Sequence, residues 1–184
     1  MMGGGPDNDP LSGRDQTDAG RRHDGRTAQA APVGRHPGRI VPAEPRHYPE
    51  WLALWRGYLD FYGVSLRDEV TAATWARVSH SGGDHCCLIH EDAAGRATGF
   101  VIYLFHRASW TDGWNCCIED IYVAPASRGS GLGRVLMEAA LAAARDRRAY
   151  RVYWQTDRDN AAARRLYDEL GQLADVVQYR VEGP

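Results

Sequence analysis

Residues 118–137 read Ile-Glu-Asp-Ile-Tyr-Val-Ala-Pro-Ala-Ser-Arg-Gly-Ser-Gly-Leu-Gly-Arg-Val-Leu-Met, which predicts a strand, a glycine-rich turn and a helix in succession. The apolar strand pattern stops at Pro125, and a helical pattern begins at Leu132. The glycines between them allow positive φ and close approach of the backbone. The first N–H groups of a helix lack internal partners and point outward with the positive end of its dipole. The stretch therefore predicts a phosphate-binding site.

The spacing of these glycines argues against two common phosphate loops. A P-loop needs Gly-Lys-Ser/Thr, but here Gly133 is followed by Arg134. A dinucleotide fingerprint needs Gly-x-Gly-x-x-Gly, and after Gly129 and Gly131 the third glycine comes one residue early. The pattern Arg/Gln-x-x-Gly-x-Gly/Ala does fit, with Arg128 in its first position.

With Val123 and Pro125 just before it, this pattern resembles the acyl-CoA pyrophosphate loop of the GNAT superfamily of N-acetyltransferases. A second element of that superfamily, Asn-x-x-Ala-x-x-Leu-Tyr, begins here at Asn160 and ends at Tyr167. It follows the strand that comes after the glycine loop, as it does in the family. An ordinary glycine-rich turn explains the first motif alone, whereas two motifs in the right order are far more specific.

Aromatic residues early in the chain indicate one branch of this superfamily. The helical stretch Trp51–Tyr62, together with Ile118–Val123, resembles the diamine (spermidine/spermine) acetyltransferases and the yeast histone and polyamine acetyltransferases. The resemblance covers residue 39 to the C-terminus. It has one clear departure, because Gly171 is followed by Gln172 rather than by phenylalanine.

The resemblance implies an α/β fold, the GNAT acyl-CoA N-acyltransferase fold, in which antiparallel N-terminal strands precede a parallel βαβ pair. The residue patterns agree with such a mixed sheet. They predict strands near residues 39–41, 86–90, 97–105, 118–123, 149–155 and 176–181, and helices over 50–62, 65–80, 133–147 and 160–170. Residues 1–38 show no hydrophobic periodicity and predict a disordered tail, so the N-acetyltransferase domain is expected over 39–184.

The resemblance also implies acetyl-CoA as the cosubstrate and assigns the residues that bind it. Backbone groups of Ile121 to Val123 would hold the acetyl group and pantetheine arm, and the glycine loop would hold the pyrophosphate. Asn160 would bond the arm, cap its own helix, or do both. The residues assigned to the cosubstrate are Ile121, Tyr122, Val123, Arg128, Gly129, Ser130, Gly131, Leu132, Gly133, Arg134 and Asn160. No cysteine or histidine has metal-ligand spacing, so no metal is expected.

Acetyl transfer to an amine needs a base, because the amine arrives protonated with a pKa near ~10. Glu119 is the first candidate, and Asp120 is the alternative base or an amine-binding residue. Neighbouring residues of a strand face opposite sides unless the strand is bulged, and the resemblance allows a bulge here. The family commonly uses the tyrosine of the second motif, Tyr167, as the acid for the leaving thiolate, although its helical spacing also fits core packing.

These residues favour acetylation of a primary amine on a small molecule: a polyamine, a diamine or an amino acid. Asp120, Tyr58 and Tyr62 would favour a cationic acceptor, with the two tyrosines at the end of the aromatic helix. Three alternatives stay open: lysine side chains of proteins or peptides as the acceptor, a non-catalytic acyl-CoA-binding sensor, and a nucleotide-phosphate-binding module.

Composition limits the classes of binding partner and the cellular compartment that the sequence predicts. A formal charge of −2 over 184 residues gives no basic field for nucleic acid or an anionic membrane, and no apolar run is long enough to span a bilayer. The four cysteines form two adjacent pairs, Cys86-Cys87 and Cys116-Cys117, whose expected reduced state suits a cytoplasmic protein. Relatives with the aromatic helix are often dimers, so the resemblance also allows a homodimer.

Overall fold

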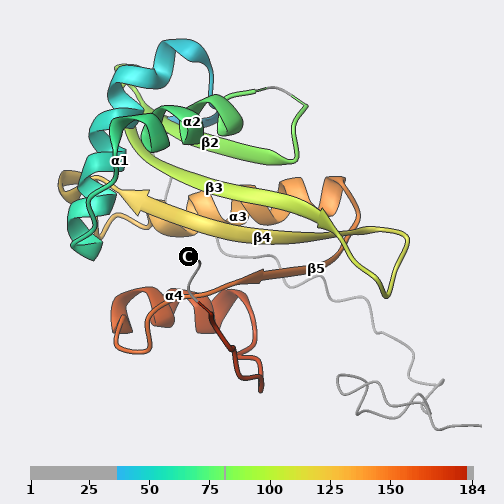
Figure 1. The fold of residues 1–184 in the computed structure, drawn as a ribbon. Helices are drawn as coiled ribbons and strands as arrows, with labels where there is room; N and C mark the ends of the chain where they lie inside the picture. The colour runs from blue at the N-terminus through green and yellow to red at the C-terminus, as the bar shows by residue number, and fades with distance from the viewer. Residues whose placement is uncertain (1–36, 81, 182–184) are drawn as a thin grey trace, which may run out of the picture. The chain divides into compact units, whose positions relative to one another are not determined.

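The computed structural model describes residues 37–80 and 82–181, which form a five-stranded sheet with helices on both faces (Figure 1). The strands are β1 (Gly38–Pro42), β2 (His85–Asp92), β3 (Ala97–Arg107), β4 (Trp114–Val123) and β5 (Ala149–Trp154). The α-helices are α1 (Tyr48–Tyr62), α2 (Asp68–Val78), α3 (Leu132–Asp146) and α4 (Ala161–Leu170). Short 3-10 helices occupy η1 (Pro45–His47) and η2 (Pro125–Ser127). The predicted N-terminal tail lies outside the described residues, except for its last two positions.

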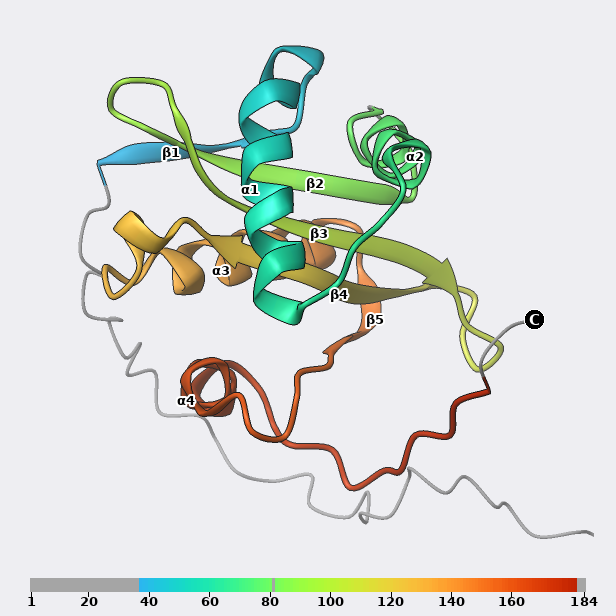
Figure 2. The ribbon, with the colours of Figure 1, turned by 60° about the vertical axis from the view of Figure 1, so that its left-hand side comes forward.

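The sheet is mixed, as the sequence predicts. The strands follow the order β1-β2-β3-β4-β5, and every neighbouring pair up to β4 is antiparallel. β4 and β5 are parallel, and α3 makes the crossover between them. Figure 2 shows α1 and α3 on opposite faces of the sheet. The α/β architecture with a parallel βαβ unit is therefore confirmed.

Each face of the sheet has its own hydrophobic core. On one face, α1 packs Trp51 and Trp55 against Phe100 of β3, and these aromatic side chains are 0%, 5% and 0% exposed. On the other face, α3 buries one stripe at helical spacing, which consists of Leu132, Leu136, Met137, Ala140 and Ala144. The aromatic side chains of the first two turns of α1 are therefore part of the core.

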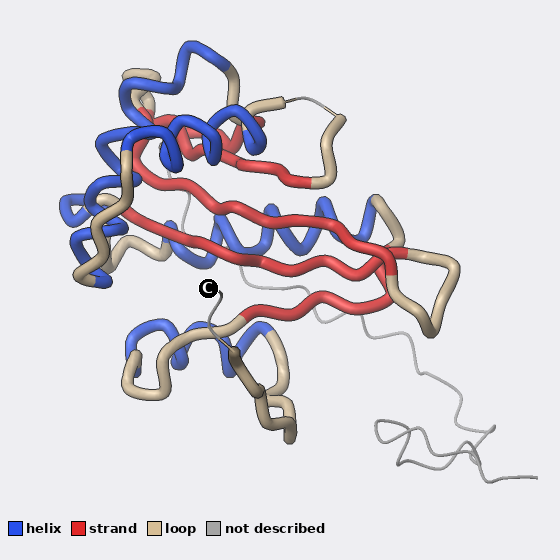
Figure 3. The backbone as a smooth tube through the Cα atoms, in the orientation of Figure 1, coloured by secondary structure: helices blue, strands red, loops and turns tan. Residues whose placement is uncertain are grey.

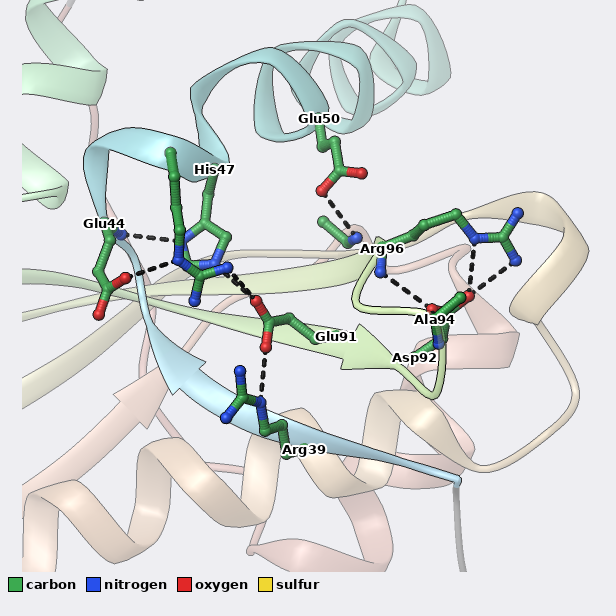
Figure 4. Close-up of polar contacts among 10 residues, drawn as sticks. Arg39, Glu44, His47, Glu50, Glu91, Asp92, Ala94 and Arg96 are labelled. Atoms are coloured by element: carbon green, nitrogen blue, oxygen red, sulfur yellow. Dashed lines mark hydrogen bonds and ion pairs between the residues drawn. The ribbon is translucent and has the colours of Figure 1, made fainter.

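A buried carboxylate ties the start of α1 to the edge of the sheet (Figure 4). Glu91 of β2 is only 1% exposed and accepts hydrogen bonds from Arg39 at 2.7 Å and Arg46 at 2.5 Å. His47 Nε2 lies 3.0 Å from the same carboxylate, while its Nδ1 accepts the backbone N–H of Glu44 at 2.9 Å. Because Nδ1 is the acceptor, Nε2 carries the proton and donates to Glu91. Arg39, Arg46, His47 and Glu91 thus form one cluster of polar contacts at this edge of the sheet.

A β-bulge interrupts the pairing of β3 and β4 next to the predicted base. Ile102 pairs with Asp120, but the following residue, Tyr103, pairs with Ile118. Glu119 is therefore the extra residue on β4 and has no partner across the ladder. The bulge that the resemblance allows is present.

The predicted final strand, residues 176–181, is not formed, and this expectation is corrected. In the described chain, residues 172–181 have no regular secondary structure, and Figure 3 draws the segment after α4 as loop. The side chains of Val176, Tyr179 and Val181 are 63%, 91% and 95% exposed. Apolar alternation stabilises a strand only when one face is buried and a neighbour supplies hydrogen bonds, and this segment has neither among the described residues.

Candidate active site

The glycine-rich turn forms an anion-binding loop at the start of α3. Gly129 and Gly131 have φ values of 74° and 88°, in the left-handed region that favours glycine. Gly131 is the N-cap of α3. The backbone N–H groups of Leu132 and Gly133 have no acceptor within the described chain. Free N–H groups at the positive end of a helix are suited to a phosphate.

A cavity of about 350 Å³ opens beside this loop. Its wall comes from the end of α1, the end of β4, the glycine turn with the start of α3, and α4. The lining residues are Tyr58, Phe61, Tyr62, Ile121, Tyr122, Val123, Ser127, Arg128, Gly129, Gly131, Leu132, Gly133, Asn160, Ala162, Ala163, Leu166 and Tyr167. The structure thus brings together the two sequence motifs and the end of the aromatic helix.

Two residues assigned to the cosubstrate lie outside this lining. The hydroxyl of Ser130 donates to the backbone oxygen of Ser127 at 2.5 Å. The guanidinium of Arg134 forms ion pairs with Glu169 of α4 and, at 3.9 Å, with Glu138. Their side chains are therefore engaged in local contacts, and their role in binding stays a prediction.

The parallel strands separate where the cavity begins. The pairing of β4 with β5 ends at Ile118 and Trp154, whereas β4 continues to Val123 and pairs only with β3 there. On the β5 side, the backbone groups of residues 121–123 therefore have no ladder partner in the described chain. Together with the free N–H groups of the turn, they fit the amide-containing arm and the pyrophosphate of a CoA thioester.

Both Asn160 and Tyr167 line the cavity, Asn160 at the start of α4 and Tyr167 toward its other end. Asn160 is the N-cap of α4, because its Oδ1 accepts the N–H of Ala163 at 3.2 Å. The Tyr167 ring packs edge-on against Trp154, with centroids 5.7 Å apart. Burial, together with the nearby Tyr62, raises the pKa of Tyr167 to about 12. The phenol therefore holds its proton at neutral pH and can donate it.

The side chain of Asp120, next to the bulge residue Glu119, reaches α1. Asp120 accepts a 2.5 Å hydrogen bond from the hydroxyl of Tyr58, a residue of α1. Burial raises the pKa of Asp120, and the neighbouring Glu119 adds to that rise while the hydrogen bond opposes it. Burial and the charge of Asp120 also raise the pKa of Tyr58 well above its usual range. Glu119 itself is exposed.

Within residues 37–80 and 82–181, no cation neutralises these two carboxylates. Neither Glu119 nor Asp120 forms an ion pair with any residue that the structure describes. A third carboxylate, Asp157 in the connection after β5, was not predicted from the sequence. Burial raises the pKa of Tyr62, and the charges of Asp157 and Asp120 add to the rise. Only the fold brings Asp157 near α1, so no local pattern marks it.

Neither a metal centre nor a membrane segment is found in the described part of the chain. Within residues 37–80 and 82–181, no group of three or more His, Cys, Asp and Glu side chains could hold a metal ion. The cysteines are free thiols. No described helix is long and apolar enough to cross a bilayer.

The sequence profile of the Acetyltransferase (GNAT) family matches residues 50–172, which include the aromatic helix, the bulge, the glycine turn and α4. The chain belongs to this family. It is an acetyl-CoA-dependent GNAT N-acetyltransferase, so the cavity beside the glycine turn is the candidate site for acetyl-CoA.

Two sequence relatives and one solved structure are similar to this GNAT chain. It is 32% identical to D-amino-acid N-acetyltransferase HPA3 of Saccharomyces cerevisiae over 145 residues, which is 78% of this chain and 90% of the relative. Streptothricin acetyltransferase of Streptomyces lavendulae is 45% identical over 60 residues, 32% of each chain. The ribosomal-protein-alanine N-acetyltransferase of Brucella melitensis biovar Abortus 2308 has a similar structure, with a TM-score of 0.67 and 21% identity over 79% of this chain and 99% of that one.

Proposed function

We propose that this acetyltransferase acts on the primary amine of a small molecule: an amino acid, a diamine or a polyamine. The observation that carries the proposal is the pair Glu119 and Asp120, which lies beside the cavity without a cationic partner in the described chain. Unpaired carboxylates attract an ammonium group and can remove its proton. The yeast relative, named for D-amino acids, supports an amino acid as one member of this class.

Glu119 acts as the base in this proposal. Its side chain is exposed, so a proton that it takes from the ammonium can pass on to water. Asp120 is more deeply placed and held by Tyr58, which suits it to binding the ammonium in a fixed position. Acetyl-CoA supplies the acetyl group as a thioester that the free amine can attack.

Tyr167 acts as the acid in this proposal. The departing sulfur needs a proton, and the hydroxyl of Tyr167 is a donor on the wall of the same cavity. Its raised pKa, about 12, keeps it protonated throughout the neutral range. After the transfer, the proton that Glu119 took from the ammonium restores the Tyr167 hydroxyl through water, so the cycle gains and loses no proton on the enzyme.

The test is a panel of amines mixed with the purified protein and acetyl-CoA, with thiol release and acetylated product as readouts. The panel contains D- and L-amino acids, 1,4-diaminobutane, spermidine and a lysine-containing peptide. Turnover with at least one small amine supports the proposal. Turnover with the peptide alone replaces it by protein acetylation, and binding of acetyl-CoA without turnover replaces it by a non-catalytic sensor.

The acid role of Tyr167 predicts a selective loss in the variant Tyr167→Phe. Turnover should fall about a hundredfold, within the range that positioned acid–base groups contribute, while the Kd of acetyl-CoA changes little. Steady-state kinetics and calorimetric titration measure the two quantities. Because Phe retains the ring that packs on Trp154, the fold should be preserved. Unchanged turnover would contradict the acid role.

The homodimer that the resemblance allows also stays part of the proposal. The described residues belong to one chain, so the oligomeric state is open to direct measurement. Light scattering on the purified protein distinguishes a dimer from a monomer of 184 residues by mass.

A further inference from the structure

The part of the sheet that α1 does not cover carries a group of polar side chains that do not line the cavity. Figure 2 shows α1 in front of β3 and β4 near the arrowhead of β4, while no helix stands in front of the opposite ends of these strands. His106 of β3, Cys117 of β4 and Tyr153 of β5 lie there, and all three side chains are partly exposed. Tyr153 pairs in register with Cys117, one step before β4 and β5 separate at Ile118 and Trp154.

The hydrogen bonds of His106 determine which of its nitrogens carries the proton. Nδ1 lies 3.0 Å from the backbone oxygen of Arg107, and a carbonyl oxygen can only accept. The Nδ1 atom is therefore the donor, and in the neutral imidazole Nε2 is the acceptor. Nε2 lies 3.0 Å from the hydroxyl of Tyr153, so Tyr153 donates its proton to His106.

This bond leaves the oxygen of Tyr153 as an acceptor toward the site. A phenolic oxygen has lone pairs besides its single O–H donor. The thiol of Cys117 interacts with the same hydroxyl, and the two lone pairs of the oxygen leave capacity for a further donor. Burial, with contributions from Cys117 and from the charge of Glu119, raises the pKa of Tyr153 to about 12, so the neutral phenol persists and stands within electrostatic reach of the proposed base.

We propose that Tyr153 binds the acceptor amine by accepting one of its N–H groups, and that His106 is the positioning residue that orients the Tyr153 hydroxyl for this contact. The inference rests on the proposed function, since it places an ammonium group between Tyr153 and the carboxylates of Glu119 and Asp120. An ammonium carries several N–H donors, and two carboxylates together with a neutral oxygen can share them. Tyr153 thereby determines specificity for an N–H-rich primary amine.

The first test compares Tyr153→Phe with Tyr150→Phe in the full-length protein. Both variants lose one phenolic hydroxyl from β5, but Tyr150 is 62% exposed and makes no hydrogen bond to a described residue. We expect Tyr153→Phe to raise the KM of the amine about tenfold, the effect of one hydrogen bond to a charged group. Its kcat and the KM of acetyl-CoA should stay within about twofold, and Tyr150→Phe should match the wild type.

An unchanged amine KM in Tyr153→Phe overturns the proposal. A fall in kcat at unchanged amine KM overturns it as well, because that result would place Tyr153 in the chemical step instead of in binding. Thermal melts of both variants show whether each is folded, so a loss of structure is not read as a loss of binding.

The positioning role of His106 is tested by two substitutions. Gln can still accept the Tyr153 hydroxyl through its amide oxygen, whereas Leu cannot. We expect His106→Leu to raise the amine KM several-fold, in the range of one neutral hydrogen bond, and His106→Gln to stay near the wild-type value. Equal increases in both variants would show that His106 acts only through packing.

Failure of the proposed function and failure of this inference give different results. If the wild type transfers no acetyl group to any amine of the panel, the proposed function fails. Calorimetric binding of 1,4-diaminobutane to the wild type and to Tyr153→Phe then tests the inference without turnover. A tenfold weaker Kd in the variant supports it, and equal or undetectable binding in both proteins overturns it.

Discussion

Glu91 and Glu119 both lie at irregularities of the same sheet, yet their surroundings are opposite. Glu91 stands where the pairing of β2 with β3 shifts, and Glu119 is the extra residue of the bulge between β3 and β4. Glu91 is buried and receives hydrogen bonds from Arg39, Arg46 and His47 (Figure 4). Glu119 is exposed and has no cationic partner among the described residues.

The carboxylate of Glu91 stabilises the fold, whereas in our proposal the carboxylate of Glu119 takes part in the reaction. Hydrogen bonds from His47, Arg46 and Arg39 lower the pKa of Glu91 to about 2, so it cannot take up a proton near neutral pH. Among the described residues, the carboxylates at the bulge have no such donor apart from the Tyr58 hydroxyl on Asp120, whose pKa is raised by burial. A break in strand register therefore does not decide the role of a carboxylate; its burial and the neighbouring charges do.

The largest expected effect is on turnover in Glu119→Gln. Removing the proposed base should lower kcat about a hundredfold, while the midpoint of thermal unfolding stays near the wild-type value, because the Glu119 side chain forms no ion pair with a described residue. The matched control is Glu69→Gln, an exposed glutamate in the first turn of α2, whose kcat should be unchanged. Turnover of Glu119→Gln at the wild-type level would transfer the base role to Asp120.

For Glu91→Gln, we expect a loss of thermal stability without a loss of turnover. The neutral amide leaves Arg39 and Arg46 without their buried counter-charge, so the midpoint of thermal unfolding should fall clearly. Turnover per folded molecule, measured well below that midpoint, should stay near the wild-type value. Glu138→Gln serves as the control, because its partly exposed ion pair with Arg134 spans 3.9 Å and contributes little. A stable Glu91→Gln variant would contradict the structural role.

The pH dependence of stability also distinguishes Glu91 from Glu119. Glu91 has an ordinary pKa of 4.5 when unfolded and about 2 when folded. Its contribution to the free energy of unfolding is therefore fully present above pH 4.5 and is lost as the pH falls toward 2. Denaturant titrations over this window should show a steeper loss in the wild type than in Glu91→Gln. Equal slopes would indicate that Glu91 is not the carboxylate responsible.

A smaller effect is expected for Tyr58→Phe. The hydroxyl of Tyr58 stabilises the ionised form of Asp120, so its removal should raise the pKa of that carboxyl further. Since Asp120 must be ionised to bind an ammonium, the acid limb of the kcat/KM profile should move to higher pH, with a few-fold loss of kcat/KM near neutrality. Phe61→Leu, a change on the same helix end without a hydroxyl, should leave the position of the acid limb unchanged.

Local sequence was enough to predict the glycine turn and the helix starts that border the cavity. Gly129 and Gly131 adopt the left-handed φ values that their residue type favours, and α3 begins where the apolar periodicity starts. Asn160 caps the helix that carries Tyr167, as its motif indicates. These features depend on residues close together in the chain, so a short pattern specifies them.

The proposed acceptor side of the site depends on contacts between residues far apart in the sequence, which no short pattern records. The face of Glu119 is set by the register between β3 and β4, and the bond between His106 and Tyr153 joins residues 47 positions apart across β4. The predicted strand at 176–181 fails for the same reason, since its alternation met no neighbouring strand among the described residues. Sequence alone thus determined the family, the glycine loop and the order of the elements up to α4, because helix starts and turns are local. Tertiary structure alone decided which carboxylate is neutralised and which is left open, because charge pairing depends on what the fold places within a few ångströms.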